Sequence, residues 1–131
     1  MFNPFKMLLL DARPVIDDAV DEAVQRDLIK SPNTLHFTFV DTNSSESLGP
    51  YEIIDNYYRG NADIVMGLAN IYTLAPMARM MPFWDTPIVT TTGLVGDFDN
   101  KHDQYKMLTR VSGSYTVLGN TIVLIVRTAN C

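Results

Sequence analysis

Apolar side chains recur at helical spacing in the first part of the chain. The stripe runs from Val15 through Val20 and Val24 to Leu28, and it predicts an amphipathic helix over 12–29. Pro14 is tolerated in a first turn, and the acidic residues after it suit the positive end of the helix dipole. The stripe is expected to face a core and to carry no function.

The rest of the chain up to residue 111 alternates between short apolar runs and helical stripes. Aromatic and β-branched residues predict a strand at 35–40, where His36 to Val40 reads HFTFV. Gly60 is a natural stop for a second helix, and the apolar stripe of a third helix ends at or shortly after Pro82. The remaining predicted elements are a helix at 50–60, a strand at 63–66, a helix around 74–81, and strands at 87–91 and 107–111.

The C-terminal segment at 118–126 is compatible with either a strand or a helix. Residues 122–126 read IVLIV and have strand propensity, whereas Leu118, Ile122, Ile125 and Val126 share one helical face. The alternation of the earlier elements favours a helix. The whole pattern predicts an α/β fold over residues 1–131, with a parallel sheet flanked by helices on both faces.

Composition narrows the class of protein. An apolar fraction of 47% with 19% charged residues is typical of a globular chain. A net charge of -5 with scattered basic residues argues against nucleic-acid binding. The longest apolar run, 122–126, is far shorter than the ~20 residues of a membrane span. The first six residues lack the pattern of a signal peptide, so neither segment is expected in this chain.

Catalytic, cofactor and metal motifs are not supported. The chain has no glycine-rich phosphate loop and no GxSxG, so a hydrolase using Ser112 or Ser114 is disfavoured. Asp97, Asp99 and Asp103 lack the spacing of an EF-hand and are expected to form a solvated acidic loop. Neither histidine has a metal-ligand context, and the single cysteine, Cys131, is the last residue. We therefore expect no enzyme activity, no metal and no cofactor.

Hydroxyl groups mark the best candidate for a binding site. Thr90, Thr91, Thr92 and Gly93 follow a predicted parallel strand, at the edge of the sheet where α/β proteins bind ligands. Ordinary strand-end chemistry explains the same pattern equally well. Asn43 begins an Asn-Ser-Ser sequon, which predicts N-glycosylation in a secreted context.

Five segments carry a resemblance that spans nearly the whole chain. They are residues 12–19, DIVMG at 63–67, APMAR at 75–79, FWDTPI at 83–88 and LTRV at 108–111. In order and spacing they resemble the membrane-distal lobe of the ligand-binding ectodomain of receptor guanylyl cyclases and natriuretic peptide receptors. The nematode group of this family is the most similar, and the fold is that of the type I periplasmic-binding-protein superfamily.

The resemblance implies an extracellular sensor in which a peptide or small ligand controls cyclic GMP production by a cyclase domain. This chain matches one incomplete lobe, so the membrane span and the cyclase are expected downstream of it. The first strand of the lobe is expected to precede the chain, unless residues 7–10 substitute. Its loss would leave open strand edges, so the isolated chain is expected to be poorly stable or to aggregate. Family analogy also implies a homodimer.

Vertebrate relatives in this family bind chloride through a serine and a Gly-Cys pair. Ser45 matches the serine, but Ala69 and Asn70 occupy the positions of the Gly-Cys pair, which puts chloride binding and the associated disulfide in doubt.

Two other classes of protein remain as alternatives to a receptor fragment. One is a free-standing solute-binding or interaction domain, and the other, which the missing motifs disfavour, is a small α/β enzyme.

Overall fold

The computed structural model describes residues 9–42 and 45–129, with side chains from residue 12 onward. Asn43 and Cys131 therefore lie outside the described residues. The chain divides into two compact units, residues 1–44 and 45–131, and each is described by itself.

The first unit contains one long helix. Helix α1 spans Leu9–Gln25, and a 3-10 turn, η1, follows at Pro32–Thr34. The helix ends four residues before the predicted boundary because Asp27 adopts a left-handed conformation with φ +55°. Its apolar stripe has no buried side chain among those described: Ile16, Val20 and Val24 are half-buried and Val15 is exposed. Leu9 and Leu10 are helical, so the run at 7–10 does not serve as a strand there.

The prediction of a strand at 35–40 is wrong. Among the described residues, the segment forms no strand and belongs to no sheet. The rings of Phe37 and Phe39 stack with centroids 6.0 Å apart. The guanidinium of Arg13 lies 5.3 Å from the centre of the Phe39 ring. Strand propensity is realised only when a neighbouring strand completes the hydrogen bonds, and here the rings pack within their own unit instead.

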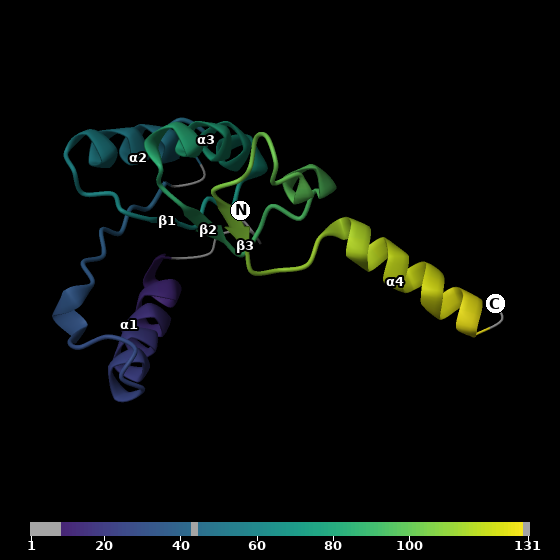
Figure 1. Cartoon of the computed structure of the whole chain (residues 1–131), viewed down its shortest axis with the longest axis horizontal. Helices are drawn as coiled ribbons and strands as arrows, with labels where there is room; N and C mark the ends of the chain where they lie inside the picture. The colour runs from purple at the N-terminus through teal and green to yellow at the C-terminus, as the bar shows by residue number, and fades with distance from the viewer. Residues whose placement is uncertain (1–8, 43–44, 130–131) are drawn as a thin grey trace, which may run out of the picture. The chain divides into compact units, whose positions relative to one another are not determined.

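The second unit is a three-stranded parallel sheet with helices (Figure 1). Its elements are α2 (Leu48–Tyr58), β1 (Val65–Met66), α3 (Ile71–Trp84), β2 (Ile88–Thr90), η2 (Gly96–Asp99), β3 (Leu108–Arg110) and α4 (Tyr115–Thr128). The strand order is β1-β2-β3, with Val65 opposite Ile88 and Ile88 opposite Leu108. The predicted parallel sheet flanked by helices is confirmed, and so is the helical choice for the tail. The expectation that helices cover both faces is wrong for the described residues, because α2 and α3 lie over the same face.

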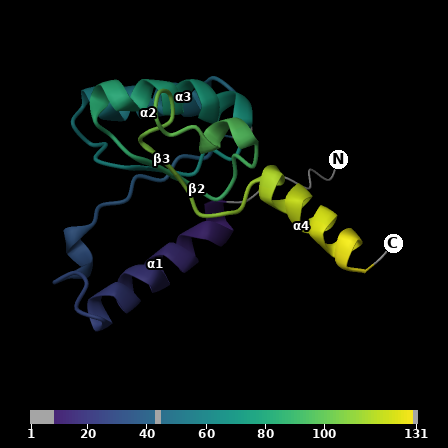
Figure 2. The same cartoon turned by 45° about the vertical axis from the view of Figure 1, so that its right-hand side comes forward.

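Helices α2 and α3 lie side by side over one face of the sheet, as Figures 1 and 2 show from two directions. Leu74, Met77, Ala78 and Met81 recur at helical spacing along α3 and are all buried. They form the core with Ile88, Phe98, Tyr105 and Leu108. Two of the methionines, Met77 and Met81, thus fill the core. On the opposite face of the sheet, Met66 and Thr109 are exposed.

Local residues set where α3 begins and ends. The Asn70 side chain accepts a hydrogen bond from the Tyr72 amide at 2.9 Å, which caps the first turn. Asp85 takes a left-handed conformation with φ +52° after the last turn, and its amide returns to the Met81 carbonyl. The ring of Trp84 stacks on Tyr57 with centroids 4.5 Å apart, which holds the ends of α2 and α3 together.

Candidate functional site

The carboxyl edge of the sheet carries the predicted Thr90–Gly93 turn. The Thr92 hydroxyl donates to the Leu68 carbonyl at 3.3 Å, and this bond ties the end of β2 to the loop after β1. The Thr92 amide donates to the Thr90 hydroxyl oxygen at 3.1 Å. The two threonine hydroxyl oxygens also lie 3.1 Å apart. The turn is therefore held by its own side chains.

Counting protons assigns the direction of these hydrogen bonds. A threonine hydroxyl has one proton to donate, and that of Thr92 goes to Leu68. In the pair of hydroxyls, Thr90 must then donate and Thr92 must accept. Thr90 and Gly93 are buried, whereas Thr91 is exposed. Within the predicted binding turn, Thr90 and Gly93 thus shape the loop, and Thr91 has an exposed side chain.

Gly93 is required by both its backbone and its surroundings. Its φ is +73°, a region that side chains rarely adopt, and an added Cβ would lie 2.7 Å from Cδ2 of Leu74 and 3.2 Å from the Phe98 ring. Gly60 has nearly the same φ, +74°, but an added Cβ there meets nothing within 4 Å. The pair therefore separates backbone strain from crowding.

Replacing Gly93 by alanine is expected to lower the free energy of unfolding by about 2–3 kcal/mol. This loss adds the cost of a side chain in a left-handed conformation to the cost of crowding in the core. Gly60→Ala is the matched control and should cost only about 1 kcal/mol, the backbone part. Urea unfolding followed by fluorescence of Trp84, the single tryptophan, measures both. Equal losses in the two variants would show that Leu74 and Phe98 do not restrict the turn.

Arg110, at the end of β3, connects this turn to the following loops. Its guanidinium donates to the carbonyls of Gly93 at 2.7 Å and Val95 at 3.3 Å. It also donates to the Ser112 carbonyl at 3.1 Å and forms an ion pair with Asp99. The Arg110 side chain is only 10% exposed, whereas the Asp99 side chain is 50% exposed. One buried cation thus fixes both loops at the carboxyl edge.

A hollow of about 320 Å³ lies beside Arg110. It is lined by Asp99, Lys101, Leu108, Thr109, Arg110 and Ser112. The Lys101 ammonium donates to the Leu108 carbonyl at 2.7 Å. Burial lowers the pKa of Lys101 from its ordinary value, and the positive charge of Arg110 lowers it further, while Asp99 opposes the shift. Two cations and one carboxylate therefore meet at this hollow.

A second hollow, of about 360 Å³, lies at the other edge of the sheet. Its lining residues precede β1 and β2 or end α2 and α3: Tyr57, Gly60, Ala62, Asp63, Trp84, Asp85 and Thr86. This position is the amino edge of the strands. Ligands of parallel α/β sheets bind at the carboxyl edge, so the hollow beside Arg110 and the Thr90–Gly93 turn are the better candidates.

The residues compared with a chloride site have local structural roles. The Ser45 hydroxyl accepts from the Leu48 amide at 3.2 Å at the start of α2, and Asn70 caps α3. Ala69 is exposed and brings no polar side chain. No hydrogen bond between described residues joins Ser45 to Asn70. Asn43, the predicted glycosylation site, lies outside the described residues.

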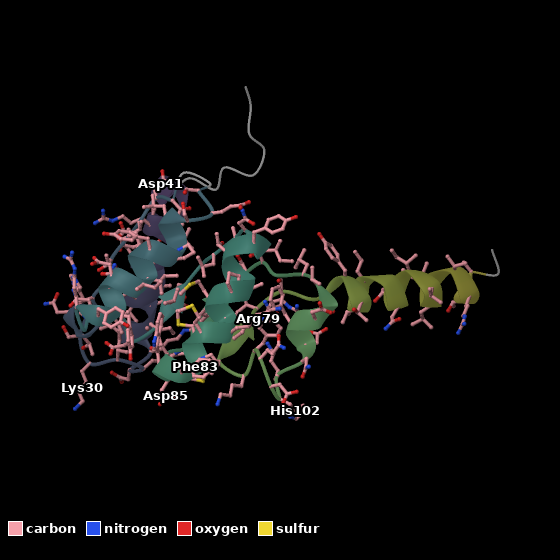
Figure 3. The ribbon with its side chains drawn as sticks, turned by 90° about the horizontal axis from the view of Figure 1, so that it is seen from above. Lys30, Asp41, Arg79, Phe83, Asp85 and His102 are labelled. Carbon is pink, nitrogen blue, oxygen red and sulfur yellow. The ribbon has the colours of Figure 1, made fainter. Side chains whose placement is uncertain are left out.

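The acidic segment at 97–103 begins within η2, continues into the loop after it, and is mostly exposed. Asp99 uses its carboxylate to pair with Arg110, and His102 lies at the outside of the loop in Figure 3. Arg79, also labelled there, reaches from α3 to Gln104 with a 2.9 Å hydrogen bond. Within residues 9–42 and 45–129, no cluster of three potential metal ligands is found.

The Ser114 hydroxyl oxygen accepts a hydrogen bond from the Val117 amide and so caps α4.

The sequence predicted the threonine turn as a candidate site, which stays a prediction, and it did not predict the hollow beside Arg110. Lys101 is surrounded by carboxylates in the sequence, so the loop reads as acidic. Arg110 belongs to the LTRV segment, yet nothing in a single sequence places it beside Lys101. The available signal was a basic residue, Arg110, near the carboxyl end of a predicted parallel strand, where α/β proteins bind ligands.

Residues 12–131 match the family described as the receptor family ligand binding region. This match covers most of the chain, and the structure provides the expected parallel sheet flanked by helices. The chain belongs to this receptor ligand-binding family. The matched part is the ligand-binding region and not a cyclase catalytic domain.

Individual relatives agree with the family. The chain is 30% identical to the receptor-type guanylate cyclase gcy-28 of Caenorhabditis elegans over 129 residues, which cover 92% of the chain and 10% of that protein. It is 29% identical to atrial natriuretic peptide receptor 2 of Rattus norvegicus over 86% of the chain and 11% of the receptor. For atrial natriuretic peptide receptor 3 of Bos taurus, the identity is 34% over 50% of the chain and 12% of the receptor.

The chain thus spans about a tenth of the length of these members of the receptor ligand-binding family. In the part of the chain that the structure describes, no helix has the length and apolar content needed to cross a bilayer.

Proposed function

We propose that this chain is part of the extracellular ligand-binding region of a receptor guanylyl cyclase. The observation that carries the proposal is the family match over residues 12–131 together with the similarity to a receptor-type guanylate cyclase over 92% of the chain. In the complete receptor, ligand binding would control cyclic GMP production by a cyclase domain that this region does not contain. The chain corresponds to one incomplete lobe of a two-lobed sensor.

The proposed ligand is a peptide or small molecule that contacts the carboxyl edge of the sheet. Support comes from the exposed Thr91 on a turn whose neighbours are fixed by the Thr90–Thr92–Leu68 hydrogen bonds. A preformed loop loses little conformational entropy on binding, which favours its use as one wall of a binding cleft. The names of two relatives include atrial natriuretic peptide, which favours a peptide. Assembly as a homodimer is proposed by the same analogy.

Sequencing the complete transcript tests the receptor assignment. We expect one reading frame in which this region is followed by a membrane span and a guanylyl cyclase domain. A frame that contains a second lobe and a secretion signal, but no membrane span and no cyclase, would instead identify a free-standing solute-binding domain and overturn the proposal.

A further inference from the structure

We propose that the hollow beside β3 binds a carboxylate group of the ligand, with the Lys101 ammonium as its main contact. This inference deepens the proposed ligand-binding role and rests on it. The hollow lies next to the threonine turn because Arg110, which lines the hollow, donates to the Gly93 carbonyl at 2.7 Å.

The charges that line the hollow do not balance. Arg110 pairs with Asp99, but Lys101 forms no ion pair within residues 45–129. Its one hydrogen bond among the described residues goes to the Leu108 carbonyl, so two ammonium protons remain for another acceptor. One uncompensated positive charge matches one carboxylate, whereas a phosphate dianion would bring excess negative charge beside Asp99.

The environment of Lys101 strengthens such a contact. Burial and the nearby Arg110 charge disfavour the protonated ammonium, and the negative charge of an anion in the hollow would counteract these two effects. Hydrogen bonds between charged groups gain strength where water is partly excluded. The Lys101 side chain is half-buried, so its charge is less screened than that of the exposed lysine, Lys106, in the same loop.

Unused polar groups complete the lining of the hollow. The Ser112 hydroxyl oxygen is the one buried side-chain oxygen or nitrogen that lacks a hydrogen-bond partner within residues 12–42 and 45–129. A buried hydroxyl without a partner is unfavourable, and serine exchanges readily between staggered rotamers. The exposed Thr109 also lines the hollow. The lining thus combines a cation with a hydroxyl group that has no partner, and both can donate hydrogen bonds to a carboxylate.

Nuclear magnetic resonance of the 131-residue chain, titrated with sodium acetate against sodium chloride at equal ionic strength, tests the inference. We expect saturable shifts of the Lys101 side-chain signal and of the Arg110 amide with acetate. The pKa of Lys101 should rise in acetate, since a bound anion favours the protonated form. Lys101→Gln should weaken acetate binding about tenfold or more, because it removes a charge-assisted hydrogen bond.

Lys106→Gln is the matched control, because it makes the same charge change at an exposed lysine of the same loop. It should leave acetate binding unchanged. Equal losses in the two variants, or shifts that rise linearly and identically in both salts, would overturn the inference. The pKa measurement uses the unaltered chain, so it decides the question even if Lys101→Gln folds poorly.

Two further probes distinguish the source of the carboxylate. Acetyl-glycyl-glycine should bind more tightly than acetate if the natural carboxylate is a peptide C-terminus, and no more tightly if it belongs to a small acid. The C-terminal amide of the same peptide should not bind, and equal binding of acid and amide would overturn the inference. A negative result in these binding experiments would not change the result of sequencing the transcript. The carboxylate site and the receptor assignment can therefore be rejected independently.

Discussion

Replacing Phe98 by alanine is expected to lower the free energy of unfolding by about 3–5 kcal/mol, the usual cost of truncating a buried aromatic residue. Phe98 is 1% exposed, and its ring meets Tyr105 edge-on with centroids 4.8 Å apart. It brings the connection between β2 and β3 onto the core formed by α3. Urea unfolding followed by Trp84 fluorescence measures the loss, because Trp84 packs in the same unit.

Phe83→Ala provides the matched control. Phe83 lies on α3 and is 88% exposed, so its loss should change the free energy of unfolding by no more than about 0.5 kcal/mol. If Phe98→Ala leaves too little folded protein, Phe98→Leu should show an intermediate loss, since it keeps part of the buried volume. A Phe98→Ala loss as small as that of Phe83→Ala would contradict the described core.

Replacing Arg110 by methionine is expected to cost about 3–4 kcal/mol, because the carbonyls of Gly93, Val95 and Ser112 all lose a charged donor. Methionine retains most of the aliphatic volume, so the loss reports hydrogen bonds more than packing. Asp99 also loses its partner, although its half-exposed carboxylate can be hydrated, and this part of the cost is small. Urea unfolding of the two chains measures the difference.

Arg127→Met removes the same side chain from the last turn of α4, where the arginine is exposed. It should change stability by no more than about 0.5 kcal/mol. Adding 1 M sodium chloride should reduce the Arg110→Met effect only slightly, because salt screens the ion pair with Asp99 but not the buried hydrogen bonds. A loss abolished by salt would show that the ion pair, and not the carbonyl contacts, accounts for the role of Arg110.

Sequence patterns predicted the elements that rest on local signals. The stripe around Leu74 and Met81 predicted α3, and turn residues bounded the strands that became β1, β2 and β3. Alternation with the earlier elements correctly chose a helix at 122–126 over strand propensity. These features depend on side-chain periodicity and on chain breakers, both of which are visible in one sequence.

Features that depend on distant partners were not predicted. The segment at 35–40 has strand propensity, but a strand needs a neighbour to complete its hydrogen bonds, and propensity says nothing about that neighbour. The hollow needs Lys101 and Arg110 on one wall, a placement that follows only from the path of the chain after η2. For the same reason, the sequence identified four candidate residues at 90–93 but not which of them is exposed.

Helix α4 contains a segment with the sequence signature of aggregation. Residues 121–126, TIVLIV, combine high β propensity with no charge and no proline, the signature of segments that stack into cross-β fibrils. Helical hydrogen bonds occupy the backbone groups that such stacking requires, yet none of the side chains of α4 is buried. The helical hydrogen bonds of α4 therefore protect this segment from stacking. Conditions that unwind α4 consequently favour amyloid-like assembly over simple unfolding.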